Sequence, residues 1–591
     1  MKKILLTIAA AAVLAGCSTF MDPLPNGEYN DDIFWDYPSL VRGLVETPYQ
    51  DVPKNWVSNE FIYSECATGN AVATNTSNNM RKLATGSLIP SDDPILGRWQ
   101  RAYKAFYSVN RFLHERRGIG IRYMVDPVAD SLLRRRLHGE AYAIRAWYGL
   151  DLFVNFCGKS VTGEYLGYPI VTEPLDVFNM DAASIKRNTM EECLEQIVAD
   201  CDSAFVYLPL AHRDNLAQHP TVEGSGAWHR FDGISVVMIK ALAYLHYASP
   251  AFNPENDLER WKTSAEYAAE AIDLKLQVDV PLGFDLKKEF TWFDPNTVET
   301  IWSSGSATNS NCENCFYPNG FQGNGYVGIT QEFVDAFPMA NGYPINDSRS
   351  GYDPANPYAG RDPRFYTMVF YNGSEVRRIT NNELMYTFET YTGGKDAPGG
   401  TNNALTGYYP KKFVYQGWNK GDTSVETQPR SLLFMRWTQL LLSFAEAANR
   451  AVGPTDENTF GMSAKYALSL VRSRNTTEGT KGLGAEGDPY LDECAAAGRD
   501  AFEKLVRNER RIELCFEGHN LHDMLRWAES VDELNKPVHR VVITRGNDNS
   551  LTYSTAVVEE RNFKSRYLPI PYSEMKRAKG LVQNEGWENW K

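Results

Sequence analysis

The stretch Asn508-Glu509-Arg510-Arg511-Ile512-Glu513-Leu514, with its continuation through Phe516-Glu517-Gly518-His519 to Leu525-Arg526-Trp527, is the most informative part of this sequence. Its apolar side chains recur at helical spacing, at Phe502, Leu505, Ile512 and Phe516. This spacing predicts an amphipathic helix over about 500–516 with Glu509 on its apolar face. A buried carboxylate needs a cationic partner or must take up a proton. Arg145 and Arg436 are the expected partners.

Several other charged side chains lie in helical, largely apolar contexts. We expect a structural ion-pair network that contains Glu140, Arg145, Arg436, Glu446, Glu509, Arg510 and Glu513. The alternative is a glycosidase acid, which would need two carboxylates at a defined separation beside a cleft. Helical glutamates beside several arginines favour the structural role. The sequence therefore predicts no catalytic residue and a protein that is not an enzyme.

Metal and cofactor sites are not indicated. His519, His522, Asp523 and Glu517 lie close together but lack the HExxH spacing of a zinc protease. The pair Cys312-Glu313-Asn314-Cys315 has no second CxxC, so a local disulfide or two free thiols are expected instead of zinc. Neither a Gly-rich phosphate loop after a strand nor a GxSxG nucleophile motif is present. We expect no metal and no cofactor.

The first half of the chain has a strongly helical pattern. Thr189-Met190-Glu191-Glu192 is a capping box that opens an amphipathic run ending before Pro209. Similar stripes begin at Trp99 and at Leu133, and further helices are expected at about 230–248, 258–274, 431–451 and 461–474. Successive helices with short connections indicate tetratricopeptide-like helix pairs, although no clean 34-residue repeat is present. Trp99 is expected in the core. Trp302 fits either the core or a ligand-binding surface, and the core is favoured.

The N-terminus resembles a bacterial lipoprotein signal. Lys2 and Lys3 precede an apolar run that is too short to span a bilayer as a helix. The run ends in Leu14-Ala15-Gly16-Cys17, which resembles a lipobox. We predict that residues 1–16 are removed and that Cys17 is the lipid anchor. An ordinary signal peptide with an incidental cysteine is the alternative.

Composition excludes some partners. The chain has 60 basic and 74 acidic side chains, a net charge of −14, and loss of the two lysines in residues 1–16 would make it −16. Such an acidic chain does not favour nucleic acid as a partner. The eight cysteines after Cys17 do not form a disulfide scaffold in a chain of 591 residues, and most fit as small core residues.

The region of about 276–430 is rich in Gly, Asn, Pro and Tyr, a composition typical of turns and loops. A saccharide presents an apolar ring face and a rim of hydroxyl groups, which aromatic rings and amide or guanidinium groups can bind. Two loops fit this need, 75–81 and 316–322. The predicted ligand-binding residues are Asn75, Asn78, Arg81, Trp292, Tyr317, Asn319 and Phe321. Ordinary solvated loops are the alternative.

About ten motifs, in order along nearly the whole chain, resemble the SusD/RagB family. They begin with the lipidated start at Cys17 and include Gly139-Glu140-Ala141 with Arg145-Ala146, Arg187-Asn188-Thr189, Phe333 to Phe337, Asn341-Gly342-Tyr343-Pro344, Arg361-Asp362-Pro363-Arg364, Arg436 with Leu440 to Ala447, Asn508 to His519, Leu568-Pro569-Ile570-Pro571 and Gln583 to Trp587. The chain departs from the family pattern at Asn520-Leu521 and at Glu585.

The resemblance implies a mainly α-helical fold, a tetratricopeptide-like scaffold with long irregular ligand-facing loops and little strand. It implies a lipoprotein of the outer membrane that binds an oligosaccharide and closes, as a lid, over a SusC-like TonB-dependent transporter. The same role for peptides or glycopeptides, as in RagB-like members, is the alternative within the family. A surface glycoside hydrolase and a purely structural lipoprotein are the alternatives outside it.

The helical first half and the loop-rich region after residue 275 predict the domain organisation. Residues 17–275 are expected to form an N-terminal helical region, and residues 276–591 a C-terminal region with the loop-rich insertion. No Pro/Ser-rich linker, charge block or low-complexity tract separates them. We therefore expect one interwoven globular domain.

Overall fold

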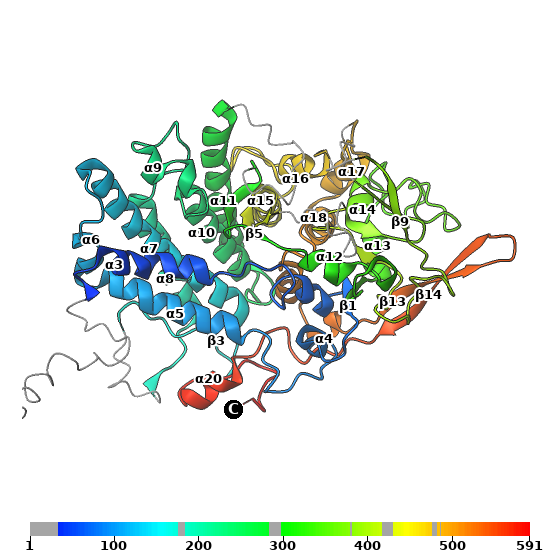
Figure 1. The fold of residues 1–591 in the computed structure, drawn as a ribbon, viewed down its shortest axis with the longest axis horizontal. Coiled ribbons are helices and arrows are strands. Elements are labelled where there is room, and N and C mark those ends of the chain that lie inside the picture. Colours follow the sequence, from blue (N-terminus) through cyan, green and yellow to red (C-terminus); the bar gives the residue numbers. More distant parts are fainter. Residues whose placement is uncertain are drawn as a thin grey trace, which may run out of the picture.

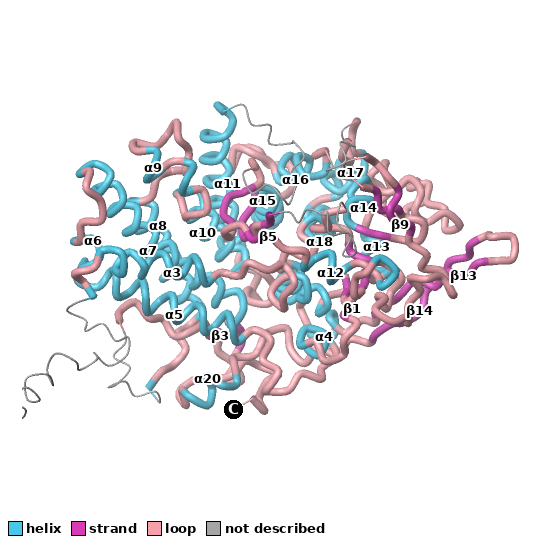
Figure 2. The backbone as a smooth tube through the Cα atoms, viewed as in Figure 1, coloured by secondary structure: helices cyan, strands magenta, loops and turns pink. Residues whose placement is uncertain are grey.

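The computed structural model describes residues 34–174, 184–282, 297–378, 381–416, 429–475, 481–484 and 486–590. Long helices occupy one side of the molecule, and short helices, strands and loops occupy the other (Figures 1 and 2). The predicted fold class is confirmed, because helices form the frame and the strands are few and short. In the described part of the chain, no helix is long and apolar enough to cross a membrane.

The frame is a succession of packed helices. α5 (Leu96–Leu113) packs on α7 (Pro127–Phe156), which packs on α8 (Met190–Tyr207). α8 contacts α10 (Gly233–Ala248), and α10 packs on α11 (Leu258–Asp279). Each helix therefore buries its apolar stripe against its neighbours, which gives the tetratricopeptide-like arrangement predicted from the spacing.

The second half continues this packing. α11 also contacts α15 (Trp437–Val452), which packs on α16 (Ala464–Arg472) and on α18 (Arg499–Glu513). The other α-helices of the described residues are α3 (Pro38–Asp51), α4 (Asn79–Ala84), α6 (Arg117–Gly120), α9 (Pro220–Glu223), α12 (Asn311–Phe316), α13 (Gln331–Ala336), α14 (Pro363–Met368), α17 (Pro489–Ala497), α19 (Asn520–Trp527) and α20 (Tyr572–Arg577).

Every sheet in the described residues has two antiparallel strands. The pairs are β1 (Ala71–Ala73) with β6 (Val327–Ile329), β2 (Gly158–Lys159) with β3 (Tyr165–Leu166), β4 (Thr300–Ser303) with β12 (Leu433–Arg436), β5 (Ala307–Thr308) with β11 (Pro429–Arg430), β7 (Val369–Phe370) with β10 (Tyr409–Pro410), β8 (Glu375–Arg377) with β9 (Leu384–Thr387), and β13 (Val538–Arg545) with β14 (Leu551–Glu559). The β13–β14 hairpin extends outward from the loop-rich side (Figure 1).

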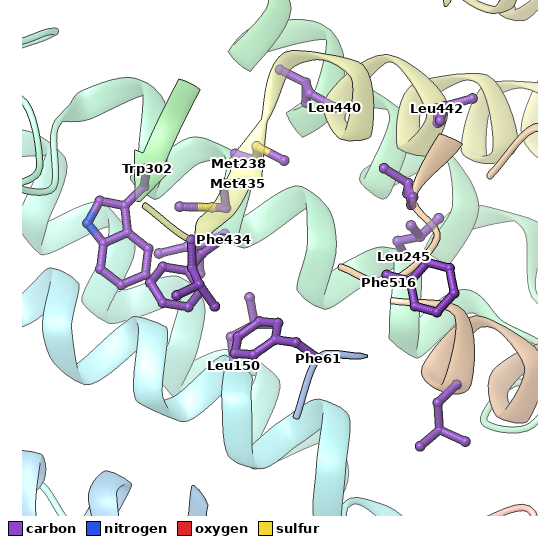
Figure 3. Close-up of a cluster of buried hydrophobic side chains, with 14 of the residues drawn as sticks. Phe61, Leu150, Met238, Leu245, Trp302, Phe434, Met435, Leu440, Leu442 and Phe516 are labelled. Atoms are coloured by element: carbon purple, nitrogen blue, oxygen red, sulfur yellow. The ribbon is translucent and has the colours of Figure 1, made fainter. Parts of the chain in front are cut away.

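One buried apolar cluster joins the two halves of the chain. Leu150 of α7 and Met238 of α10 belong to the same cluster as Trp302 and Phe434 of the second half, and Figure 3 shows the four side chains in one view. The Trp302 ring stacks on Phe231 with 4.2 Å between ring centroids and is 1% exposed. Trp99 is also buried, at 5% exposure. Both tryptophans are therefore core residues. The division at residue 275 remains a prediction.

The helix predictions hold, with two corrections at their ends. The capping box at Thr189 is present and begins α8. The helix predicted from residue 431 begins only at Trp437, because residues 433–436 pair with β4 as strand β12. The helix predicted through residue 516 ends at Glu513, and Phe516 has a positive φ of 63°. Lys412 Nζ donates to the carbonyl oxygens of Glu513 and Cys515, at 2.9 and 2.8 Å, and so stabilises this turn.

Candidate ligand-binding surface

The strand pair β1–β6 brings the two predicted ligand loops together. The strands pair from Ala71 with Ile329 to Ala73 with Val327, and both are buried. Immediately beyond them, the Thr74 N–H donates to the Tyr326 carbonyl oxygen at 2.8 Å. The Thr74 hydroxyl donates to the Gly325 carbonyl oxygen at 2.6 Å. The start of the first loop, at Thr74, thus lies beside residues 325–326 that follow the second loop, 251 residues later in the chain.

The first loop is shaped by its own side chains. Asn75 is exposed, and its side-chain oxygen accepts from the Ser77 N–H at 2.8 Å. Asn78 caps α4 by accepting from the Met80 and Arg81 N–H groups, at 3.0 and 3.1 Å. Arg81 pairs with Glu559, and its Nη1 donates to the Ala73 carbonyl oxygen at 2.7 Å. Asn78 and Arg81 therefore hold the loop, and Asn75 is presented to solvent.

In the second loop, two predicted contact residues are wrong. Tyr317 is 0% exposed and Phe321 is 4% exposed. Their rings pack edge to face at 4.7 Å, and Phe321 also contacts Tyr386 at 4.9 Å. Burial in this aromatic cluster leaves neither ring a free face for a saccharide. Both residues are packing residues beneath the loop.

The exposed groups of this loop are different ones. Asn319 is exposed, and its backbone N–H donates to the Asn402 carbonyl oxygen at 3.1 Å. Gln322 is exposed with a left-handed backbone, φ 62°, and Tyr326 is 43% exposed. Sequence reasoning missed Gln322 and Tyr326. A usable signal was present for Tyr326, because it directly precedes the apolar triplet 327–329 and stands where a buried strand begins.

We use the term β1–β6 surface for the exposed side chains of these two loops: Asn75, Thr76, Ser77, Asn319, Gln322 and Tyr326. It combines one exposed aromatic ring with amide and hydroxyl groups that can donate and accept hydrogen bonds. This is the chemistry that a saccharide requires. Trp292 and Cys17 lie outside the described residues, so their predicted roles stay predictions.

The buried charges form a central ion-pair network. Glu509 is 0% exposed and pairs with Arg364 and, at 2.6 Å, with Arg472. These are not the partners expected from the sequence, Arg145 and Arg436. Arg436 instead contacts Glu517 at 2.7 Å and Glu299 at 3.1 Å. The members of the network are Glu299, Asp362, Arg364, Lys412, Arg436, Arg472, Arg474, Asp488, Glu509, Glu513 and Glu517.

The other predicted members belong to three separate clusters. Arg145 pairs with Asp200 at 2.6 Å. Glu140 lies 2.9 Å from Arg136 and 3.5 Å from Arg230. Glu446 and Asp523 share Arg510 and Arg526. The predicted members thus lie in separate ion-pair clusters and do not form one network.

The guanidinium groups keep the central carboxylates charged. Burial alone would raise the pKa of Glu509, but Arg364 and Arg472 outweigh it and hold the pKa below its ordinary value. Burial is outweighed in the same way at Glu513 by Arg474, Arg436 and Arg364, so its pKa is also lowered. A glycosidase acid needs a raised pKa beside a cleft. These carboxylates have the opposite shift.

The cysteines of the described residues are free thiols in the core. Cys312 and Cys315 are free, buried thiols, and burial raises the pKa of Cys312 to about 12. All eight described cysteines are buried, as expected for core residues. Among the described residues, no group of three or more His, Cys, Asp or Glu side chains is placed to hold a metal ion.

Comparisons with known proteins agree with this architecture. A model described as "SusD family" matches residues 298–587, and one described as "Starch-binding associating with outer membrane" matches residues 19–227. The chain belongs to the SusD family. A third model, for a prokaryotic membrane lipoprotein lipid attachment site, matches residues 1–18. This SusD-family chain is therefore a lipoprotein associated with the outer membrane.

Known SusD-family proteins resemble the chain over most of its length. The SusD-like protein P38 of Formosa agariphila is 20% identical over 531 residues, which are 89% of this chain and 91% of that protein. A SusD-like protein from Bacteroides fragilis has a TM-score of 0.70 at 21% identity, covering 94% of this chain and 99% of its own. A SusD-like carbohydrate-binding protein from the same species has a TM-score of 0.65 at 19% identity, covering 93% and 99%.

Proposed function

We propose that this chain binds an oligosaccharide at the cell surface and presents it to a SusC-like TonB-dependent transporter, over which it acts as a lid. The observation that carries the proposal is the pairing of β1 with β6, which places Tyr326 beside Asn75 at the exposed end of a buried strand pair. Membership of a family that contains carbohydrate-binding proteins supports it.

The chemistry of the surface explains how it would hold a sugar. The Tyr326 ring, which is 43% exposed, can cover the apolar face of a pyranose. Its backbone is held by hydrogen bonds to Thr74 and Cys315, at 2.8 and 2.9 Å. Amide groups of Asn75, Asn319 and Gln322 can bond ring hydroxyl groups as donors or acceptors. Their loops are held by backbone hydrogen bonds, so little ordering is required on binding.

Catalysis has no part in this proposal. The central carboxylates are buried among arginines, and their lowered pKa values keep them from donating a proton near neutral pH. Binding without turnover is thus the expected behaviour. A lipid anchor at Cys17 would hold the whole chain at the membrane beside its transporter.

An affinity screen tests the ligand class. The soluble form, from residue 18 onward, would be run in affinity gels against neutral and acidic polysaccharides and titrated with a peptide digest. We expect retention by at least one polysaccharide without release of sugar products. Binding only to peptides would move the proposal to the peptide alternative, and product release would contradict a non-catalytic role.

Co-purification tests the transporter partnership. The full lipidated chain, carrying a C-terminal tag, would be purified from outer membranes in mild detergent. We expect a TonB-dependent barrel to co-purify in a stable ratio. A chain that binds glycans but is recovered without any barrel would contradict the lid role and leave glycan binding intact.

A further inference from the structure

A cleft with a different set of lining residues lies outside the β1–β6 surface. It is a cleft of about 670 Å³ between α18, α19, the segment 67–70 that precedes β1, and the segments 533–538 and 561–563. None of the six residues of the β1–β6 surface lines it. Its volume falls within the range of about 300–1,000 Å³ that is typical of small-ligand sites.

The cleft is positively charged although the chain is acidic. Five cationic side chains line it, and only Glu332 and Glu533 oppose them. The cations are Lys504, Arg507, Arg511, Lys536 and Arg561; Arg507 is paired with Glu503 and Arg561 with Glu559, and the other three have no carboxylate within 4 Å among the described residues. Charges beyond about 8 Å are screened at physiological ionic strength, so the local excess of cations decides what enters the cleft.

Arg511 is a partly unpaired cation on the wall of this cleft. Its Nε donates to the Asn70 side-chain oxygen at 2.6 Å, and its Nη2 donates to the Gly69 carbonyl oxygen at 3.3 Å. Within the described ranges, no carboxylate oxygen lies within 4 Å of its guanidinium, unlike the arginines of the central ion-pair network. Burial lowers the pKa of Arg511, which a bound anion would raise again.

The rim and wall supply the remaining contacts. Lys504 and Lys536 are exposed. In the described part of the chain, neither lysine has a carboxylate within 4 Å. Arg507 pairs with Glu503 and lies over the Trp527 ring, 5.1 Å from its centroid. Met524 and Trp527 line the cleft as well, so a polar, cationic mouth adjoins some apolar surface.

We propose that this cleft binds the oxyanion of an acidic saccharide, either a uronate carboxylate or a sulfate ester. The proposal rests on the proposed function, because it takes the ligand of this chain to be a glycan. Guanidinium groups match planar or tetrahedral oxyanions with paired N–H donors, and lysines add charge at the rim. Methionine and tryptophan side chains then contact the carbon atoms of the sugar ring.

Calorimetry on the soluble chain, from residue 18 onward, tests the proposal. Trigalacturonate, a sulfated disaccharide, inorganic sulfate and a neutral trisaccharide would be titrated into wild type, into Tyr326→Ala and into a Lys504→Gln, Arg507→Gln double variant. Lys504 is exposed and the Arg507 side chain is 31% exposed, so folding should survive. An Arg577→Gln, Lys579→Gln double variant is the matched control, because it removes the same charge from an exposed segment elsewhere.

We expect one acidic probe to bind, the cleft variant to weaken its binding at least tenfold, and the control to match wild type. The galacturonate and sulfate arms identify which oxyanion is recognised. Failure of both acidic probes, or equal binding by wild type and the cleft variant, would overturn the proposal. The proposal would also be overturned if Tyr326→Ala lost binding of the acidic saccharide while the cleft variant bound it like wild type.

The same data separate this proposal from the proposed function. If the neutral glycan binds and neither acidic saccharide does, the proposed site for an acidic saccharide is rejected and the proposed glycan binding is retained. Binding of inorganic sulfate that depends on Lys504 and Arg507, without binding of any saccharide, shows an anion site and rejects the acidic saccharide together with the glycan role.

Discussion

Glu509 shows how a charge can be stable in the core. Its carboxylate is 0% exposed, and two guanidinium groups hold its pKa below the ordinary value. Removing one partner of a buried pair leaves an uncompensated charge, which commonly destabilises a protein by about 3–5 kcal/mol. The residue is therefore structural, and its loss should affect folding before binding.

We predict that Glu509→Gln lowers the free energy of unfolding by about 3 kcal/mol, because Arg364 and Arg472 each lose a carboxylate partner. Denaturant unfolding of the soluble chain measures this. Glu259→Gln, at an exposed position in α11, is the control and should change stability by less than about 0.5 kcal/mol. A folded Glu509→Gln chain of unchanged stability would contradict the structural role.

The sequence predicts that Glu509 needs a cationic partner, but it does not identify that partner. The helical spacing of Phe502, Leu505 and Ile512 places Glu509 on the buried face, and the structure bears this out. Arg364 lies in α14, far away in the sequence, and no periodic pattern connects it to α18. The predicted ligand contacts of Tyr317 and Phe321 were wrong for a related reason. The sequence of a loop with aromatic and polar residues does not reveal which rings are buried.

Among the elements, the loop 316–326 depends on a tight backbone approach. The Gly323 N–H donates to the Pro318 carbonyl oxygen at 3.0 Å. A Cβ atom added at Gly323 would fall on the backbone of Tyr317. Glycine is thus required for the turn that carries Asn319 and Gln322.

We predict that Gly323→Ala weakens glycan binding by an order of magnitude or more, because the turn must open and move Asn319 and Gln322. Calorimetry with the retained glycan measures the affinity, and circular dichroism confirms that the frame is folded. Gly305→Ala is the matched control, since an added Cβ there meets nothing within 4 Å. Equal affinity for both variants would show that the turn does not shape the site.

Helices were predictable where an apolar stripe at helical spacing follows an N-capping residue, as at Thr189. The strand β12 was not, because Leu433 to Arg436 are apolar enough to continue a helix. Its extended backbone is fixed by pairing with β4, more than 130 residues earlier. Likewise, the pairing of β1 with β6 joins two three-residue segments that carry almost no local signal. The candidate surface could therefore be predicted as two loops but not as one site.

In the whole molecule, three buried or half-buried histidines make stability depend on pH. A pocket of about 150 Å³ is lined in part by His246, His519 and His522. Burial lowers the pKa of His519 to about 4 and of His522 to about 3, and it holds the pKa of His246 well below its ordinary value. In the unfolded chain, each would take up a proton near pH 6.5.

We predict that the chain loses stability as the pH falls from about 6.5 towards 4. The unfolded state binds protons in this range and the folded state does not, so the stability is present above the unfolded pKa and is lost below it. His519 alone accounts for up to about 2 kcal/mol by pH 5. Denaturant unfolding at pH 7.5, 6.5 and 5.0 measures the loss.

His519→Gln should reduce this pH dependence, and His219→Gln, outside the pocket, should leave it unchanged. Below about pH 4.5, protonation of the central carboxylates adds a further loss, because their folded pKa values are also lowered. Constant stability between pH 7.5 and 5.0 would show that the pocket histidines are not held neutral.

The most direct test of the account is a calorimetric titration of the soluble chain with a glycan retained in the affinity screen, run on wild type, Tyr326→Ala and Tyr317→Phe. Loss of an aromatic stacking contact should weaken binding about tenfold in Tyr326→Ala. Tyr317→Phe keeps the buried ring and should bind like wild type. Wild-type affinity in Tyr326→Ala, or an equal loss in both variants, would contradict a glycan site at the β1–β6 surface.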